Sequence, residues 1–185
     1  MLIKLFDFIE LRSLQETDAP DIFQVIDKER TYLGQWLPFV AKTKKVADTK
    51  AFVKAALTAA PKNDEEIFTL RKRNQFIGLV GFKNTDRDNR KTEIGYWLSE
   101  SFQKQGIVTK AVDELCHYAF TQLNINRIQI KCATGNQASK KIPQRLNFFF
   151  EGIERDGELL SDGNFIDLEV YSKLRKDLPK SRSPF

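Results

Sequence analysis

The residues best suited to chemistry lie in a short loop around Gly106, between an apolar run and an amphipathic run. Residues 103–108 read QKQGIV, and Lys110 follows just after. If the first run is a strand and the second a helix, the first N–H groups of that helix have no internal partner, and its dipole makes this end positive. A phosphate binds readily in such a place, and Gly106 allows backbone angles that a β-carbon would resist. The loop therefore predicts an anion cradle, although a plain turn with a glycine would use the same residues.

The elements on both sides of the loop must position it. Residues 92–98 read TEIGYWL, as in a strand, and the apolar spacing from Val108 to Ala119 marks one face of a helix. Residues 127–133 then alternate between polar and apolar side chains, as in a half-buried strand. A strand, a helix and a second strand in this order predict two parallel strands joined by a right-handed crossover.

The remaining elements complete a mixed sheet. A helix is expected to start near Asp18, because aspartate is a favourable N-cap and Pro20 suits the first turn. Another helix is expected at residues 46–60, where Pro61 ends it, and a further one at residues 136–146. Further strands are expected at residues 8–14, 67–70, 76–82, 148–153 and 165–174. This order predicts an α/β (α+β) fold with a mixed, mostly antiparallel twisted sheet and helices on both faces.

Length and composition restrict the class of protein. The 185 residues are 41% hydrophobic and 30% charged, which predicts one domain over residues 1–178 and a flexible tail at 179–185. No apolar run approaches the ~20 residues of a membrane helix and no signal peptide is recognisable, so we expect a cytoplasmic protein that contacts no membrane. Cys116, Cys132 and His117 are the only residues of their types, and no disulfide framework or metal site is expected. The net charge of +5 fits an anionic cofactor, and direct nucleic-acid binding is not required.

The pattern Gln103-x-x-Gly106-x-Val108, which follows EIGYWL at residues 93–98, resembles the pyrophosphate loop of the GNAT family of N-acetyltransferases. The surrounding sequence is similar to the Rim-type branch of that family, the ribosomal-protein N-terminal acetyltransferases. The matching segments, within residues 9–178, are LGQWLPF (33–39), DNRK (88–91), EIGYWLSESF (93–102), TKAV (109–112), YAF (118–120), NR (126–127), ATGNQAS (133–139), IPQRL (142–146) and FEG (150–152). The resemblance implies the acyl-CoA N-acyltransferase (GNAT) fold.

The resemblance also implies that acetyl-CoA, as a co-substrate, lies where the strands at 92–98 and 127–133 separate. Main-chain groups of Trp97 and Leu98 are then expected to pair with the pantetheine arm like an added strand. Asn136 is expected beside the pantetheine, and Lys140 or Lys141 near the adenosine phosphate. The pyrophosphate is expected to be held by Gln103, Lys104, Gln105, Gly106, Ile107, Val108 and Thr109.

The implied reaction is acyl transfer from a thioester to an amine. Glu93 shares a strand face with Gly95 and Trp97 and is the candidate base, either directly or through a water chain; a surface glutamate at a strand end is the alternative. Ser139 corresponds to the serine that gives the thiolate its proton in the Rim-type branch; a helix N-cap is the alternative. Pro143 lies four residues further on and cannot donate to the carbonyl of Ser139, which loosens the backbone there.

The acceptor side is less well defined by the sequence. Trp36 lies in the segment that builds the acceptor wall in the family, although it could equally be a core residue. A main-chain N–H near Tyr96 is expected to meet the oxyanion, which places Tyr96 beside the substrate. Asp167 and Tyr171 alternate along the strand at 165–174; they either line the amine-binding side or form the polar face of an amphipathic strand.

The sequence therefore predicts an acetyl-CoA-dependent N-acetyltransferase that acts by direct transfer, with the N-terminal α-amine of a (ribosomal) protein as acceptor. Three alternatives stay open at this level. They are a small-molecule amine acetyltransferase for polyamines or aminoglycosides on the same fold, a cofactor-binding module without turnover, and a basic nucleic-acid binder. Either a monomer or a homodimer is compatible with the sequence.

Overall fold

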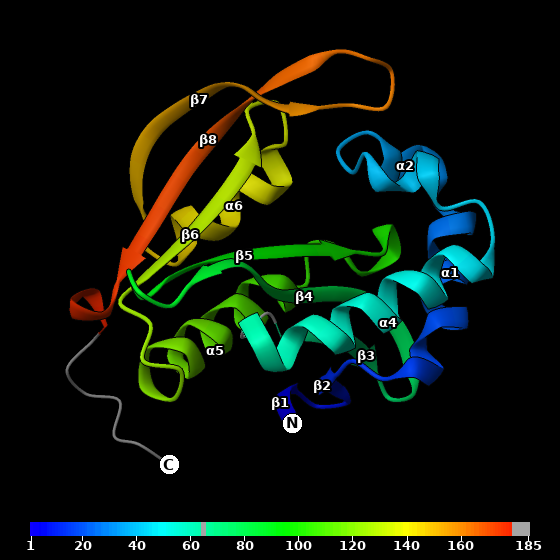
Figure 1. The fold of residues 1–185 in the computed structure, drawn as a ribbon, viewed down its shortest axis with the longest axis horizontal. Helices are drawn as coiled ribbons and strands as arrows, with labels where there is room; N and C mark the ends of the chain where they lie inside the picture. Colours follow the sequence, from blue (N-terminus) through cyan, green and yellow to red (C-terminus); the bar gives the residue numbers. More distant parts are fainter. Residues whose placement is uncertain (64–65, 179–185) are drawn as a thin grey trace.

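One mixed sheet organises the structure (Figure 1), a computed structural model that describes residues 1–63 and 66–178. In this part of the chain, eight strands follow the order β1-β2-β3-β4-β5-β6-β8-β7. All neighbours are antiparallel except β5 and β6, which are parallel. The strands are β1 (Leu2–Phe6), β2 (Ile9–Ser13), β3 (Ile67–Lys72), β4 (Gln75–Asp86), β5 (Lys91–Leu98), β6 (Arg127–Ala133), β7 (Phe149–Leu159) and β8 (Phe165–Leu174). The expected tail at 179–185 lies outside the described residues.

Helices cover both faces of the sheet, as predicted. The α-helices are α1 (Ala19–Lys28), α2 (Arg30–Gly34), α3 (Phe39–Lys42), α4 (Val46–Asn63), α5 (Ile107–Thr121) and α6 (Gln137–Arg145). On one face, Ile94 of β5 shares a buried cluster with Leu115 of α5. On the other, Trp97 of β5 shares a second cluster with Ile22 of α1. None of the helices described is both long and apolar enough to cross a membrane.

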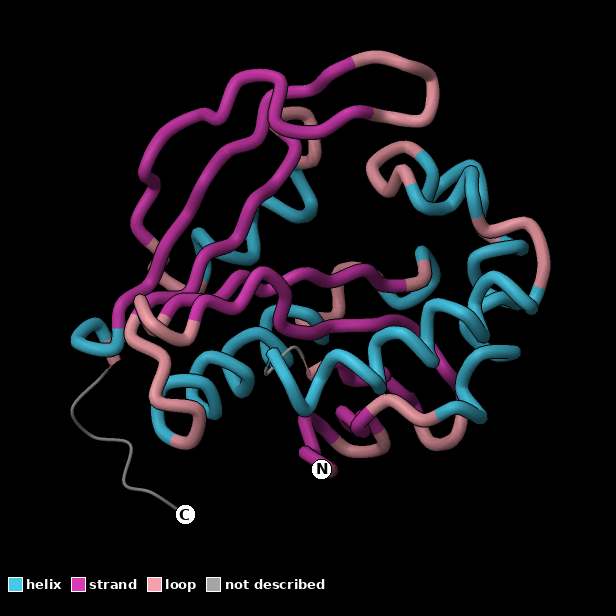
Figure 2. Tube along the Cα trace, viewed as in Figure 1, coloured by secondary structure: helices cyan, strands magenta, loops and turns pink. Residues whose placement is uncertain are grey.

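The β5–α5–β6 unit is the predicted parallel crossover, and its two strands soon separate. Residues 91–93 of β5 pair with residues 127–129 of β6, and the ladder ends there. Beyond that point β5 continues beside β4, while β6 continues beside β8. Figure 2 shows β6, β8 and β7 rising away from the plane of the other strands. The far half of β5 therefore has one edge without a neighbouring strand.

The structure corrects several expected boundaries. The helix expected at 46–60 continues to Asn63, so Pro61 does not end it. Pro61 has no N–H to donate to the carbonyl of Leu57, so the last turn of α4 continues without that one bond. The strand expected at 148–153 extends to Leu159. Elements β1, α2 and α3 were not predicted, because runs of four or five residues are too short for a hydrophobic period to be recognised.

A buried charge cluster joins α1 to the sheet. Asp18 was expected to cap α1, but its side chain makes no cap hydrogen bond. Its carboxylate is 1% exposed and lies 2.7 Å from the guanidinium groups of both Arg12 in β2 and Arg71 in β3. Arg71 reaches Asp21 of α1 as well, at 2.9 Å. The cluster thus links β2 and β3 with the start of α1, which lies between these two strands in the chain.

We predict that Asp18→Ala destabilises the protein by about 3 kcal/mol, because it leaves the guanidinium of Arg71 buried without its main partner. Asp27→Ala is the matched control, since the Asp27–Arg30 pair is exposed and worth less than about 0.5 kcal/mol. Urea denaturation of both variants measures the difference. Equal losses would show that the Asp18 cluster adds nothing beyond a surface ion pair.

Candidate active site

The loop before α5 has the geometry of an anion cradle. Gly106 is the N-cap of α5 with φ of 74°, and Lys104 also has a positive φ of 61°. No atom lies within 4 Å of where a β-carbon on residue 106 would stand, so the backbone angle, and not a lack of space, favours glycine. Ile107 and Val108 are buried in the core cluster and anchor the first turn. The N–H groups of that turn point out of the helix toward the loop.

Two side chains from the α1–α2 region hold this loop in place. The carboxylate of Glu29 accepts hydrogen bonds from Ser99 Oγ at 2.6 Å and from the backbone N–H of Glu100 at 2.9 Å. Gln103 donates from its side-chain amide to the hydroxyl of Tyr32 in α2. Burial raises the pKa of Tyr32, so its hydroxyl stays protonated. The loop is therefore shaped before any ligand binds.

A cavity of about 570 Å³, the loop cavity, opens in front of this loop. Its volume lies in the range of small-molecule sites. Lys141 and Arg145 contribute cations to its lining, whereas Lys140 pairs with Glu169 at 2.6 Å. Every residue predicted to bind the cofactor lines it: Trp97, Leu98, Gln103, Lys104, Gln105, Gly106, Ile107, Val108, Thr109, Asn136 and Ser139. The cavity fits an elongated anionic ligand with its phosphates at the α5 N-terminus.

The start of α6 is built around a proline. The side chain of Asn136 caps the helix and accepts from the N–H of Ser139 at 3.0 Å. Ser139 is thus in the first turn, and the alternative that it is the cap is wrong. Pro143 lies inside the helix and cannot donate to the carbonyl of Ser139. That carbonyl instead accepts from the hydroxyl of Tyr96 at 3.2 Å, which ties α6 to β5 across the separated strands.

Three polar side chains meet at this point. The Ser139 hydroxyl lies 3.1 Å from the Tyr96 hydroxyl and donates to Cys132 Sγ at 3.3 Å. Burial holds the pKa of Tyr96 well above 10 and also raises the pKa of Cys132. At neutral pH all three groups therefore keep their protons. Since the sulfur is a weak acceptor, the Ser139 proton can turn to a stronger one.

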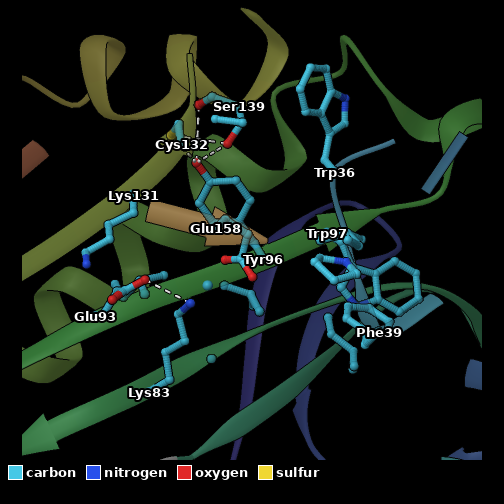
Figure 3. Close-up of a pocket in the computed structure, with 18 of the residues that line it drawn as sticks. Trp36, Phe39, Lys83, Glu93, Tyr96, Trp97, Lys131, Cys132, Ser139 and Glu158 are labelled. Atoms are coloured by element: carbon cyan, nitrogen blue, oxygen red, sulfur yellow. Dashed lines mark hydrogen bonds and ion pairs between the residues drawn. The ribbon is translucent and has the colours of Figure 1, made fainter. Parts of the chain in front are cut away.

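A second cavity of about 660 Å³, the central cavity, lies on the other side of this cluster (Figure 3). Six residues line both cavities, namely Trp36, Leu37, Tyr96, Trp97, Asn136 and Ser139. Trp36 can reach this position because residue 135 is glycine: a β-carbon there would stand 3.0 Å from the indole ring. Ligands in the two cavities would therefore meet at Ser139 and Tyr96.

Glu93 lines the central cavity and is not a surface residue. It is 6% exposed. Its carboxylate pairs with Lys83 Nζ at 2.9 Å and accepts a long hydrogen bond, 3.4 Å, from the Asn84 amide. In Figure 3 this pair lies on the opposite side of the cavity from Trp36 and Phe39. The cavity thus has a charged end and an aromatic end, with the Ser139 cluster between them.

The structure does not bring Asp167 and Tyr171 to this site. Ile166 and Leu168, on the opposite face of β8, line the central cavity instead. The Asp167 carboxylate accepts from the N–H of Asp156 at 2.9 Å. Tyr171 is buried against Glu169, and this burial and the carboxylate raise the pKa of Tyr171 to about 12. Of the predicted acceptor-side residues, Trp36 and Tyr96 are the ones that reach the cavity.

Sequence reasoning missed one carboxylate. Glu158, near the end of β7, lines the central cavity, and among the described residues its carboxylate has no hydrogen-bond or ion-pair partner. Figure 3 shows it between the Ser139–Tyr96 pair and the Glu93–Lys83 pair. Nothing in its local sequence marks it, because it belongs to a polar hairpin. In residues 1–63 and 66–178, no group of three or more His, Cys, Asp or Glu side chains could hold a metal ion.

Known proteins share this architecture. The family model of the acetyltransferase (GNAT) domain matches residues 9–148. The chain is 36% identical to the putative ribosomal N-acetyltransferase YdaF of Bacillus subtilis (strain 168), over 94% of this chain and 95% of that protein. It is 30% identical to the ribosomal-protein-serine acetyltransferase of Escherichia coli (strain K12), over 93% and 96% of the two chains.

Among solved structures, RimL, a ribosomal L7/L12 alpha-N-protein acetyltransferase in complex with coenzyme A, matches with a TM-score of 0.89 and 28% identity. The match covers 94% of this chain and 98% of that one. The family model spans more than half of the sequence, and the relatives match it nearly from end to end. The chain therefore belongs to the GNAT family of acetyltransferases.

Proposed function

We propose that this protein transfers the acetyl group of acetyl-CoA to the N-terminal α-amine of a protein, with a ribosomal protein as the acceptor. One observation carries the proposal: two cavities meet at Ser139 and Tyr96, one with an anion cradle and one with a carboxylate that has no partner in the described part of the chain. The names of the two relatives, a putative ribosomal N-acetyltransferase and a ribosomal-protein-serine acetyltransferase, support this acceptor.

The loop cavity is suited to the coenzyme. The cradle at residues 103–109 would hold the diphosphate, and the open edge of β5 at Trp97 and Leu98 would pair with the pantetheine arm. Asn136 would lie beside the same arm. When bound, acetyl-CoA supplies an activated acyl carbon and a thiolate leaving group. Lys141 and Arg145 line the same cavity and would be available to a further phosphate.

The amine must lose a proton before it can attack. At pH 7 this costs about 1.4 kcal/mol for an α-amine and about 4.6 kcal/mol for a lysine, which favours an N-terminal acceptor. Within residues 1–63 and 66–178 Glu158 has no hydrogen-bond or ion-pair partner, so it binds the incoming ammonium group. Glu93, already engaged by Lys83, takes the proton through water at the charged end of the cavity.

The leaving thiolate needs a proton donor. Ser139 Oγ–H is the candidate on the shared wall: it donates to the weakly accepting sulfur of Cys132 and lies 3.1 Å from the hydroxyl of Tyr96. Tyr96 stays protonated because burial raises its pKa, and its hydroxyl stabilises the serine oxygen. The proton that the attacking nitrogen loses as the amide forms returns to Ser139. A main-chain N–H near Tyr96 stabilises the oxyanion.

The direct test measures release of free CoA thiol from acetyl-CoA with hexapeptides that carry a free N-terminal serine. We expect turnover with these peptides and none when the same α-amine is chemically blocked, even if an internal lysine is present, because the lysine is harder to deprotonate. Polyamines and aminoglycosides are assayed in parallel. Turnover of these small amines alone, or calorimetric binding of acetyl-CoA with no turnover of any amine, would reject the proposed acceptor.

Ser139→Ala is expected to lower kcat about a hundredfold, because the thiolate loses its proton donor. The Kd for CoA, measured by calorimetry, should change little, since the backbone N–H of residue 139 still donates to the capping side chain of Asn136. Ser13→Ala, at the end of β2, is the control for loss of a hydroxyl elsewhere. An unchanged kcat in the Ser139 variant would remove this residue from the mechanism.

Glu158→Gln and Glu93→Gln separate the two carboxylate roles. The first is expected to raise KM for the peptide about tenfold, because a charge-assisted contact with the ammonium is lost. The second should lower kcat and move the rise of the rate to higher pH, since the amine must then lose its proton to solvent. Rates against pH with saturating acetyl-CoA distinguish them. A Glu158 variant with normal KM and low kcat would identify Glu158 as the base instead.

A further inference from the structure

The aromatic end of the central cavity is lined by exposed phenylalanine side chains and by a packed tryptophan. Phe39 of α3 and Phe52 of α4 line it and are 39% and 42% exposed, although both are large apolar side chains. Trp97 lines the same cavity and packs edge-to-face against Phe76, with ring centroids 5.6 Å apart. Figure 3 shows Phe39 beside Trp97, on the side away from Glu93. Exposed apolar surface that continues into a cavity is a common sign of a binding site.

The polar groups at this end are already satisfied by the chain itself. Thr43 donates to the carbonyl of Phe39 at 2.9 Å. Asp48 accepts from two backbone N–H groups, those of Lys44 and Lys45, at 2.8 and 3.0 Å. Thr49 donates to backbone carbonyls at 2.9 Å. The two threonine hydroxyls are therefore engaged by the chain, and Phe39 and Phe52 supply the exposed apolar surface that a ligand meets at this end.

The rest of the cavity has the opposite character. Glu158 offers a carboxylate beside Tyr96 that no other described residue binds, and the far end holds the Glu93–Lys83 pair. Lys131 is paired with Glu154 at 2.5 Å. When the amine of an acceptor is at Glu158, its next residues lie in a cavity with a charged end and an aromatic end. Only the aromatic end has large exposed apolar side chains for them to cover.

We propose that Phe39 and Phe52 form an apolar subsite for the side chain of the second or third residue of the acceptor. The inference rests on the proposed function, because it assumes a peptide whose N-terminus lies at Ser139. An extended chain spans about 3.3–3.6 Å per residue, so the side chains next to the N-terminus are the ones confined to the cavity. The acceptors selected are N-terminal segments with an isoleucine, leucine, valine or similar residue at the second or third position.

The test uses hexapeptides with an N-terminal serine and glycine elsewhere, in which the second or the third residue is either isoleucine or serine. The wild-type protein is expected to favour isoleucine at one of these positions by about tenfold in kcat/KM, as is usual when a substrate fills or leaves an apolar pocket. The Phe39→Ala/Phe52→Ala double variant should reduce this preference to about twofold or less, because the wall is gone.

Phe149→Ala is the matched control. Phe149 is 71% exposed on the edge strand β7 and lies outside the central cavity, so this variant should keep the full preference. Because the readout is a ratio between two peptides on the same enzyme preparation, a partly misfolded variant lowers both values and leaves the ratio intact.

Each outcome decides one question. Turnover without any preference at either position, or a preference that survives in the double variant, overturns the apolar subsite and leaves the proposed function standing. No turnover with any peptide overturns the proposed function and the subsite with it. Preference that is lost in the Phe149 variant too would show that it does not arise at Phe39 and Phe52.

Discussion

The separation of β5 and β6 is the constraint on which the whole site depends. Two parallel strands that pair over only three residues and then diverge leave main-chain donors and acceptors free on the inner edge of β5. Such groups are costly to bury without partners, so the gap needs to be filled by side chains or by a ligand with a polar backbone of its own. The loop cavity and the central cavity both open onto this gap.

The chain spans the gap with one set of contacts, and these contacts also prepare the chemistry. Pro143 leaves the carbonyl of Ser139 without a helical donor, and the hydroxyl of Tyr96 supplies one from the other strand. The same hydroxyl lies beside Ser139 Oγ. The hydrogen bond that Pro143 removes from α6 is thus replaced by a contact with β5. This contact sets the spacing between α6 and β5 and also places Tyr96 beside Ser139, the proposed proton donor.

The helical region before β3 connects the two cavities. Glu29 and Tyr32 hold the loop that precedes α5, while Trp36 and Phe39, a few residues further on, line the central cavity. The buried Asp18–Arg71 pair in turn fixes the start of α1 on the sheet. One short segment, residues 29–39, therefore holds the loop before α5 and also forms a wall of the central cavity.

Much of this protein was readable from local sequence. The left-handed angle at Gly106, the crossover from β5 to β6 and the proline in α6 each depend on one residue type or on a period along the chain, and each was found where expected. The family resemblance then identified the loop-cavity residues.

Tertiary structure alone decided which face of β8 meets the central cavity, since alternation defines two faces without saying which one a helix or hairpin will cover. It also decided that Glu93 is paired whereas Glu158 has no partner among the described residues. Pairing of β4 with β5 brings Lys83 to Glu93, and pairing of β7 with β8 places Glu158 at the central cavity.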